Sequence, residues 1–256
     1  MKLVVDIGNT NVVVGIRYNE QWRQIWRFKT KKDAKELDYS LKLHNAMWEA
    51  GIHPDEIKTK VLSTVVPELK LQFVNILNKM NPKPLIILDQ NIFNQLDIDI
   101  PSPNEIGSDL VANVLAAFHV YHQDLIIIDF GTALTFTVLN KKGEILGVNI
   151  APGLKTAMNA LGDKTSQLDS VPLEFPDNVL GKNTETAIQN GVLIGYTGLV
   201  NHMIAVLKNA VGPHYKVLIT GGLWHILKDK LTAIDYVAPN LTLDGLAKLP
   251  EILTKN

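Results

Sequence analysis

The sequence of 256 residues contains no cysteine, which excludes disulfide bonds, thiol nucleophiles and cysteine-ligated zinc. It has no excess of either charge, because 25 basic and 26 acidic residues give a formal net charge of −1. A basic surface for nucleic acid or an anionic membrane is therefore not expected. Apolar runs such as Leu125–Ile128 have the length of a strand, well short of the ~18 residues of a spanning helix, and Asp6 interrupts the first run as no signal peptide would. These absences predict a soluble, cytoplasmic protein.

The most informative stretch lies at residues 3–15. Two short apolar runs, Leu3–Val5 and Val12–Val14, flank Asp6, Gly8 and an Asn-Thr-Asn sequence, which predicts a β-hairpin with a polar tip. The tip offers a carboxylate, turn N–H groups, and amide and hydroxyl side chains. Such a set can hold a nucleotide phosphate chain and its Mg²⁺, with the acid on the metal directly or through water. Alone, the motif would more often be an ordinary turn.

The motif occurs twice at one constant offset of 123 residues: Asp6, Gly8 and Asn9 match Asp129, Gly131 and Thr132. A repeat near half the chain length indicates a duplicated domain. We therefore expect two domains, residues 1–122 and residues 123–256, with two phosphate-binding hairpins facing each other across a cleft.

Around the first hairpin, a third strand is followed by alternating helices and strands. Four residues at helical spacing predict a helix with its N-cap at Asp33: Leu37, Leu41, His44 and Trp48. The next helix starts near Pro67 and should bury four apolar residues: Leu69, Phe73, Ile76 and Leu77. A long polar loop over residues 89–103 precedes Asp109, which we place at the start of a third helix. The helix dipole there favours an ionised carboxylate, and Asp109 would equally suit a helix cap.

The second half repeats this plan, with strands at 125–130, 134–140 and 144–150 and an irregular segment at 162–182. A long helix is expected from about Thr184 to Ala210. Its stripe of Gly191, Gly195 and Gly198 costs helix stability, so it predicts close packing against another backbone, within the subunit or at a dimer interface. A later strand ends in Gly221-Gly222.

Three strands followed by alternating helices and strands, twice over, is the plan of the duplicated actin-like ATPase (RNase H-like) fold, an α/β architecture. There, two similar domains clasp ATP, with the hairpins at the phosphates and a later Gly-Gly turn at the adenosine. The analogy predicts an ATP-dependent phosphotransferase or ATPase.

Six finer motifs occur in order along nearly the whole chain: Asp6-Ile-Gly-Asn-Thr-Asn11, Pro103-Asn-Glu-Ile-Gly-Ser-Asp109, Asp129-Phe-Gly-Thr-Ala133, Ala151-Pro-Gly-Leu154, Gly181-Lys-Asn-Thr184 and Thr220-Gly-Gly222. Together they resemble type III pantothenate kinases. The resemblance implies transfer of the ATP γ-phosphate to the primary hydroxyl of pantothenate, giving 4'-phosphopantothenate in the first step of coenzyme A biosynthesis. It also implies a homodimer, Mg²⁺, and a monovalent cation, K⁺ or NH₄⁺.

The resemblance assigns roles residue by residue. Asp109 would be the general base, Asp129 would hold the monovalent cation, and Asp6 would hold Mg²⁺ through water. The implied ATP-binding residues are Asp6, Ile7, Gly8, Asn9, Thr10, Asn11, Val12, Val13, Gly131, Thr132, Gly221 and Gly222. The implied pantothenate-binding residues are Ile100, Gly107, Ser108, Asp109, Leu110 and Thr184, the last reaching the site from the partner subunit.

The chain departs from the family pattern in three places. Leu110 stands where an arginine is usual, Ile100 stands where a tyrosine is usual, and Gly147-Val148 replaces a Gly-Gly pair. The first two change the acceptor contacts and leave the ATP site untouched. Two alternatives therefore stay open: another phosphotransferase of the same fold, or a non-catalytic, nucleotide-binding regulatory relative. The retained Asp109, Asp129 and Thr132 argue against the regulatory alternative.

Overall fold

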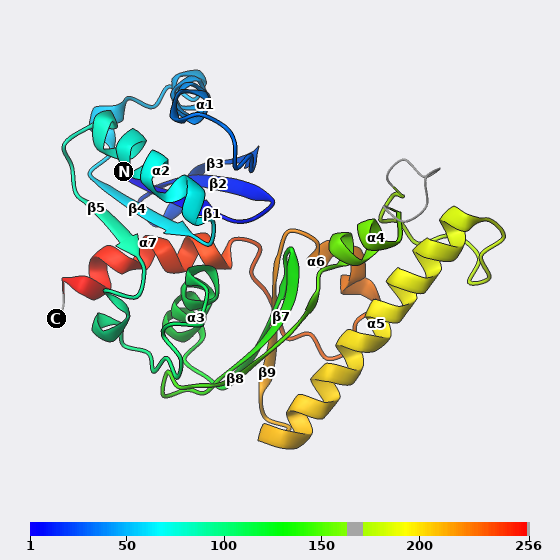
Figure 1. Cartoon of the computed structure of the whole chain (residues 1–256). Coiled ribbons are helices and arrows are strands. Elements are labelled where there is room, and N and C mark those ends of the chain that lie inside the picture. The colour runs from blue at the N-terminus through cyan, green and yellow to red at the C-terminus, as the bar shows by residue number, and fades with distance from the viewer. Residues whose placement is uncertain (163–170, 255–256) are drawn as a thin grey trace. The chain divides into compact units, whose positions relative to one another are not determined.

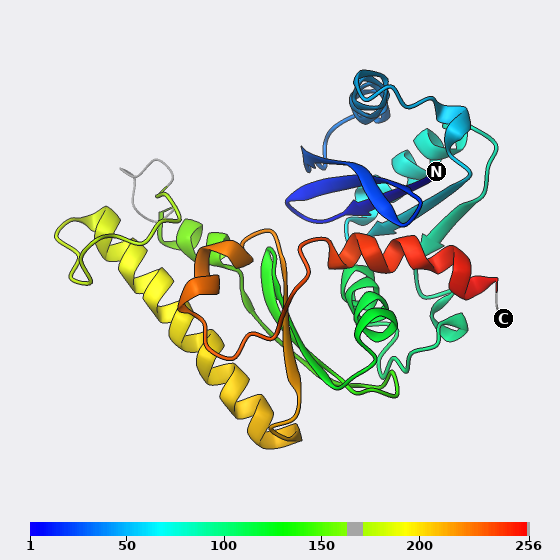
Figure 2. The same cartoon turned by 180° about the vertical axis from the view of Figure 1, so that it is seen from behind.

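The computed structural model describes residues 1–162 and 171–254, so residues 163–170 of the predicted irregular segment lie outside it. The chain divides into two compact units. The first comprises Met1–Val120 and Leu241–Asn256, and the second comprises Tyr121–Asn240. Each unit contains one five-stranded mixed sheet flanked by helices (Figures 1 and 2). The sequence-based division between residues 122 and 123 stays a prediction about domains.

The first sheet has the strand order β3-β2-β1-β4-β5, with β1 antiparallel to β2 and parallel to β4. Its strands are β1 (Lys2–Ile7), β2 (Asn11–Tyr18), β3 (Gln21–Lys29), β4 (Thr59–Thr64) and β5 (Leu85–Leu88). The helices of this part are α1 (Glu36–Glu49), α2 (Pro67–Met80), α3 (Ser108–Tyr121) and α7 (Leu241–Leu253), with 3-10 turns at Pro54–Glu56 and Phe93–Gln95.

Helices cover both faces of the first sheet. Side chains alternate along a strand, so Leu3, Val5 and Ile7 of β1 pack in one cluster with the buried residues of α1 and α2. The opposite face carries α7, which contacts β1, β4 and β5, and α3, whose first turn is hydrogen-bonded to β4 (Figure 1). The helix α7 therefore packs on the first unit, although it follows the second unit in the chain.

The helix α1 forms where it was predicted, with a different N-cap. Its N-cap is Lys35, whose N–H donates to the Asp38 carboxylate (3.0 Å), so the prediction of Asp33 was wrong. The residues used to predict the helix lie mainly on its exposed side, with Leu37 63% and Trp48 76% exposed. The buried residues of α1 are Tyr39, Leu43, Ala46 and Met47. In α2, by contrast, all four residues predicted to point inward are buried.

The second sheet has the order β10-β9-β6-β7-β8, with β6 antiparallel to β7 and parallel to β9. Its strands are β6 (Leu125–Phe130), β7 (Ala133–Leu139), β8 (Ile145–Pro152), β9 (Lys216–Gly221) and β10 (Tyr236–Val237). The helices are α4 (Leu154–Gly162), α5 (Thr184–Val211) and α6 (Trp224–Leu227), with a 3-10 turn at Lys228–Lys230. The core of this unit joins β6, β7 and β9 to α4, α5 and α6. The strands at 125–130, 134–140 and 144–150 and the long helix agree with the prediction within two residues.

Candidate functional site

The tip of the first hairpin is a short loop between β1 and β2 that is braced from β3. The Gly8 N–H donates to the Asn11 carbonyl (3.0 Å), and the Gly8 carbonyl accepts from the Thr30 hydroxyl (2.7 Å). The Thr30 N–H also donates to the Thr10 carbonyl (2.9 Å). Asn9, Thr10 and Asn11 are exposed. A braced backbone that presents amide and hydroxyl side chains to solvent suits anion binding.

Asp6 lies near the end of β1 beside the start of α3. In the parallel pairing of β1 and β4, Asp6 is opposite Ser63, and paired residues present their side chains on the same face. The Ser63 hydroxyl lies 3.0 Å from the Ser108 hydroxyl, which also donates to the Thr64 carbonyl (3.3 Å). The structure thus brings the first hairpin and the first turn of α3 to one edge of the first sheet.

Asp109 is half-buried in the first turn of α3. Its Oδ1 accepts from the Leu110 N–H (2.8 Å) and packs directly over Gly107, where an added Cβ would lie 2.5 Å from Oδ1. Burial raises the pKa of Asp109, and the hydrogen bond from the Leu110 N–H acts in the opposite direction. A carboxylate with a raised pKa binds a proton more readily than an exposed one, as a general base must. Gly107 leaves the space that this side chain occupies.

The predicted acceptor-binding residues differ in exposure. Ile100 is 9% exposed and Leu110 is half-buried. Both side chains are aliphatic, so neither presents a polar group to a ligand. Thr184 is exposed at the first position of α5, behind the N-cap Asn183, whose side chain accepts from the Thr186 N–H (2.8 Å). Ile100 and Leu110 belong to the first unit and Thr184 to the second.

The tip of the second hairpin is braced by the Ala151–Leu154 corner. The Gly131 N–H donates to the Ala133 carbonyl (3.1 Å), while the exposed Thr132 accepts through its carbonyl from the Gly153 N–H (3.0 Å) and the Thr156 hydroxyl (2.7 Å). An added Cβ at Gly153 would lie 2.2 Å from the Gly131 carbonyl oxygen. The corner can therefore approach this tip only with glycine at position 153.

Asp129 lies near the end of β6 against a glycine turn. It pairs with Thr220 of β9, and an added Cβ at the next residue, Gly221, would lie 2.4 Å from Asp129 Oδ1 and 2.6 Å from the Phe130 backbone. Gly221 has a φ of +94°, which side chains rarely adopt, whereas an added Cβ at Gly222 meets nothing within 4 Å. The predicted residues of the second half, Asp129, Gly131, Thr132, Gly221 and Gly222, therefore lie at one edge of the second sheet.

Three hydroxyl residues that support the two tips or the start of α3 were not singled out from the sequence: Thr30, Ser63 and Thr156. Thr30 and Ser63 are separated from their partners by 22 and 45 residues, and no local pattern connects them. Thr156 follows the Ala151–Leu154 motif by two residues, and that proximity was the available signal.

The glycine stripe of α5 faces open space. An added Cβ at Gly191, Gly195 or Gly198 would meet nothing within 4 Å in the part of the chain that the structure describes. The predicted close backbone partner is therefore not found within these residues, and the interface alternative stays a prediction.

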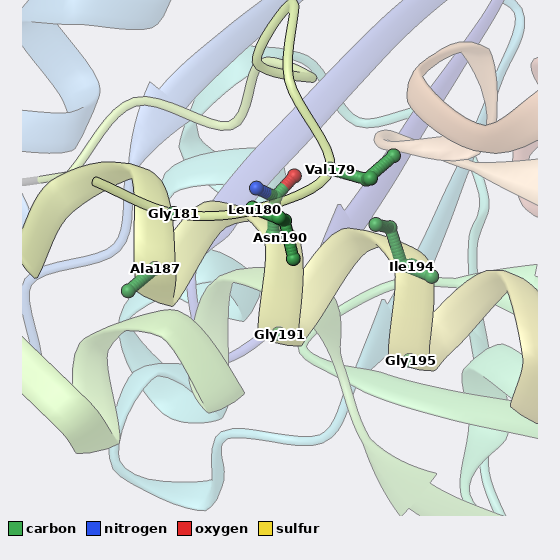
Figure 3. A pocket seen from close by; sticks show the side chains of 8 residues that line it. All are labelled: Val179, Leu180, Gly181, Ala187, Asn190, Gly191, Ile194 and Gly195. Carbon is green, nitrogen blue, oxygen red and sulfur yellow. The ribbon is translucent and has the colours of Figure 1, made fainter. Parts of the chain in front are cut away.

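An open pocket of about 410 Å³ runs along the first half of α5 beside this stripe (Figure 3). Its lining is mainly apolar: Val179, Leu180, Gly181, Ala187, Asn190, Gly191, Ile194 and Gly195. The Asn190 amide donates to the Asn178 carbonyl (2.8 Å), which holds the preceding segment against the helix. None of the predicted ATP- or pantothenate-binding residues lines it.

The helix α5 also corrects the expectation that no segment is apolar enough to span a membrane. Over residues 1–162 and 171–254, it is the one helix with the length and composition to do so, and 28% of the qualifying window is buried. The helix has no uninterrupted apolar run of that length, because glycines and polar residues lie between its apolar residues, and its charged residues Glu185 and Lys208 lie in its first and last turns. Core helices of soluble proteins pass the same test, so the finding alone does not place α5 in a membrane.

Solved structures with the same fold cover almost the whole chain. A conserved Campylobacter jejuni protein assigned to the Baf family of transcriptional activators is 19% identical, with a TM-score of 0.60 over 99% of this chain and 98% of its own. An activator of 2-hydroxyisocaproyl-CoA dehydratase from Clostridium difficile, with bound ADPNP, is 13% identical, with a TM-score of 0.58 over 99% and 96%. A ROK hexokinase from Thermus thermophilus is 15% identical, with a TM-score of 0.50 over 96% of both chains.

At these identities the likeness concerns the fold alone, and it confirms the predicted actin-like ATPase architecture. The family follows from a separate comparison. The model of the type III pantothenate kinase family matches residues 2–206, a range that includes both hairpins, the start of α3 and the start of α5. The match covers well over half of the chain, which therefore belongs to the type III pantothenate kinases, a family of phosphotransferases.

Proposed function

We propose that this protein transfers the γ-phosphoryl group of ATP to the primary hydroxyl of pantothenate, which gives 4'-phosphopantothenate and ADP. The observation that carries the proposal is the family match over residues 2–206. The geometry of each sheet edge supports it, because a carboxylate and a braced hairpin tip lie together in both units.

In the proposed step, Asp109 is the general base. The pantothenate hydroxyl oxygen attacks the γ-phosphorus, the bond from this phosphorus to the β–γ bridging oxygen breaks, and the hydroxyl proton passes to an Asp109 carboxylate oxygen. Two observations support this role: burial raises the pKa of Asp109, and Gly107 leaves its carboxylate room at the start of α3. Phosphoryl transfer otherwise asks mainly for positioning and charge neutralisation.

ATP would be held by residues 6–13 at the first tip and by Gly131, Thr132, Gly221 and Gly222 at the second. The Asp6 carboxylate and the exposed side-chain oxygens of Asn9 and Thr10 are oxygen donors of the type that suits Mg²⁺. Asp6 would hold this ion through water, and Asp129 would hold the monovalent cation. When bound, such cations neutralise the charge of the phosphates.

Pantothenate would be contacted by Ile100, Gly107, Ser108, Asp109, Leu110 and Thr184. Leu110 and Ile100 cannot supply the hydrogen bonds of an arginine and a tyrosine. We therefore propose a rearranged acceptor pocket. Backbone amides near Gly107, the Thr184 hydroxyl, and Lys155 or Lys182, which are both exposed, would serve the carboxylate, amide and hydroxyl groups of pantothenate.

We further propose a cytoplasmic homodimer in which α5 packs against its copy. The open glycine stripe and the exposed apolar side chains of Ile194 and Val206 on α5 support this arrangement. Gly195→Leu should then leave the fold intact and weaken the dimer, as measured by sedimentation over a range of concentrations. Ala160→Leu, which adds the same side chain at an exposed position of α4, is the control. A wild-type protein that is active as a monomer would refute the idea that Thr184 of the partner subunit completes the acceptor site.

The function is tested by ADP release from Mg·ATP in K⁺ buffer, with and without pantothenate, and by the mass of the product. We expect ADP release that depends on pantothenate and falls when K⁺ and NH₄⁺ are both replaced by Na⁺. Turnover with other alcohols only would favour a different phosphotransferase. ATP binding without turnover of any acceptor would favour a regulatory relative.

A further inference from the structure

The helix α7 touches α3 through its backbone. An added Cβ at Gly245 would lie 1.8 Å from the Ala112 carbonyl oxygen, 2.7 Å from its carbon and 3.1 Å from the Ala112 Cα. The first two distances are shorter than real Cβ contacts, so the two helices can meet here only because position 245 is glycine. Any side chain at 245 must move α3 or α7.

A hydrogen bond lies beside this contact. The Thr242 hydroxyl is bonded to Asn113 Oδ1 (2.8 Å), and Asn113 is 4% exposed. Thr242 and Gly245 are three residues apart on α7, and their partners are neighbours on α3. The two contacts therefore constrain one turn of α3 both in distance and in rotation.

That turn carries Asp109. Ala112 and Asn113 follow Asp109 by three and four residues, so the three share a helix face one turn apart. Immediately before Asp109, Ser108 is hydrogen-bonded to Ser63 and Thr64 of β4. The start of α3 is thus held between the end of β4 and the start of α7.

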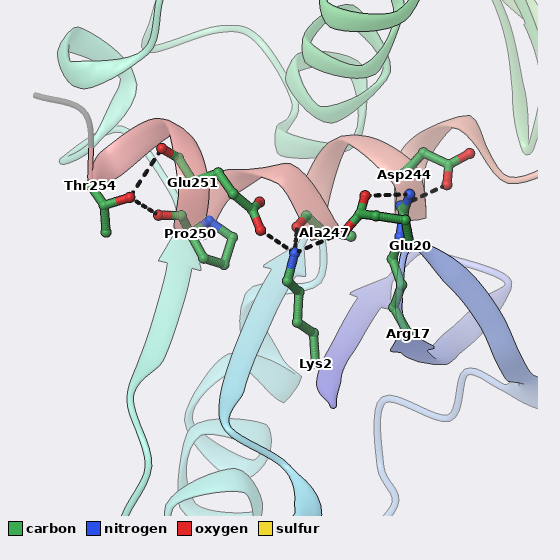
Figure 4. A network of polar contacts seen from close by, with 8 residues as sticks. All are labelled: Lys2, Arg17, Glu20, Asp244, Ala247, Pro250, Glu251 and Thr254. Atoms are coloured by element: carbon green, nitrogen blue, oxygen red, sulfur yellow. Dashed lines mark hydrogen bonds and ion pairs between the residues drawn. The ribbon is translucent and has the colours of Figure 1, made fainter.

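The helix α7 is itself anchored to the first sheet, so it cannot easily yield (Figure 4). The Asp244 carboxylate accepts from Arg17 Nη1 (3.0 Å) and Trp22 Nε1 (2.8 Å). Further along the helix, Lys2 donates to the Ala247 carbonyl (3.2 Å) and pairs with Glu251. The strain from a larger residue at 245 would therefore pass to α3. The family match ends at residue 206, before α7 begins.

We infer that Gly245 and Thr242 of the C-terminal helix are positioning residues that set the place of the Asp109 carboxylate. The kinetic test of this inference rests on the proposed function, because it measures turnover of pantothenate. The spectroscopic test does not, because it follows the titration of the Asp109 carboxyl group itself. Neither residue touches substrate in this scheme. They act through the first two turns of α3.

The test compares Gly245→Ala with Ile252→Val, a control that removes one methylene from a buried residue two turns further along α7. For Gly245→Ala we expect kcat to fall about 10²-fold, because small displacements of a reacting group can cost that much, and KM for ATP to stay within about twofold. The ¹³C carboxyl resonance of Asp109, assigned by its loss in Asp109→Asn, should titrate at a lower pH, because a displaced turn admits water. Ile252→Val should lower only Tm.

A second pair of variants covers the case in which Gly245→Ala does not fold. Thr242→Val removes the hydroxyl and Thr242→Ser keeps it, so the serine variant should restore both kcat and the Asp109 titration. Folded variants with an unchanged Asp109 pKa and unchanged kcat would overturn the inference. If the wild type does not phosphorylate pantothenate, the proposed function fails, while the Asp109 titration still decides the inference.

Discussion

The two hairpin tips are built alike. In each, a glycine N–H donates to a carbonyl across the tip, from Gly8 to Asn11 and from Gly131 to Ala133. In each, a tip carbonyl accepts from a threonine hydroxyl at 2.7 Å. These threonines, Thr30 and Thr156, come from different kinds of element: one follows a strand and the other lies on a helix.

The two tips differ in the residues that lie at the end of the neighbouring parallel strand, which is β4 in the first unit and β9 in the second. In the first unit, β4 is hydrogen-bonded to the start of α3, which adds a second carboxylate, Asp109. In the second unit, β9 ends in Gly221, and Asp129 and the Phe130 backbone fill the space that a side chain at position 221 would need. The two similar units therefore differ mainly in the segment that follows the strand parallel to the hairpin, β4 in one and β9 in the other. The first edge carries the carboxylate that we propose as the proton acceptor, whereas at the second edge a glycine allows the close approach of the Phe130 backbone.

The largest expected effect is that of Asp109→Asn, which removes the feature that is unique to the first edge. Turnover should fall by about 10²–10⁴-fold, because only the proton acceptor is lost. Turnover within a few-fold of the wild type would remove Asp109 from the mechanism.

The same substitution should also change how the thermal stability of the protein depends on pH. The pKa of Asp109 is raised in the folded state, so the folded state binds a proton here more tightly than the unfolded state. The stabilisation of the fold by this protonation is complete below the ordinary carboxyl pKa and is lost as the pH rises through the raised pKa. Asp109→Asn should therefore unfold at a higher temperature than the wild type at pH 7, and this difference should shrink at acid pH. A gap that widens on acidification would contradict the sign.

Gly221→Ala tests the second edge. The positive φ and the contacts with Asp129 and Phe130 should lower the free energy of unfolding by about 1–3 kcal/mol. Gly222→Ala is the matched control, and its open surroundings predict a change within about 0.5 kcal/mol. Urea unfolding measures both. Equal losses from the two substitutions would show that the close approach at Gly221 does not matter.

The bracing that the tips share is tested by Thr30→Val and Thr156→Val. Each loses one hydrogen bond to a tip carbonyl, worth about 0.5–1.5 kcal/mol. The Thr30 bond is partly buried and the Thr156 bond is exposed, so Thr30→Val should lower Tm and ATP affinity more. The reverse order would mean that the second tip depends more on its brace.

Leu110→Arg is expected to have the smallest effect on activity, although it introduces the residue that is usual in the family. Position 110 is half-buried, so an arginine there would bury an unpaired charge unless the acceptor supplies a partner. We expect kcat/KM for pantothenate to be unchanged or lower. An inert wild type with an active arginine variant would show that the native protein is not a pantothenate kinase as it stands.

Local sequence was sufficient for the elements that signal themselves. The apolar run before Asp129 predicted β6, and the periodicity of α2 identified its buried face. The long helix α5 begins at Thr184, the residue that was predicted. The order of the elements led to the fold, and the six motifs led to the family. The roles of Asp6, Asp109, Asp129 and the acceptor-binding residues stay predictions.

Tertiary structure decided what sequence spacing leaves open. In α1, two sets of residues have helical spacing, and packing against the sheet and α2 buried the set with Tyr39 and Leu43 rather than that with Leu37 and Trp48. Likewise, nothing local shows that Thr30 braces Gly8, or that Gly245 touches Ala112 across 133 positions of the chain. Local sequence determines which elements can form, because periodicity and capping act over a few residues. Their buried faces and their distant partners depend on apolar burial and hydrogen bonds that exist only once the chain has folded.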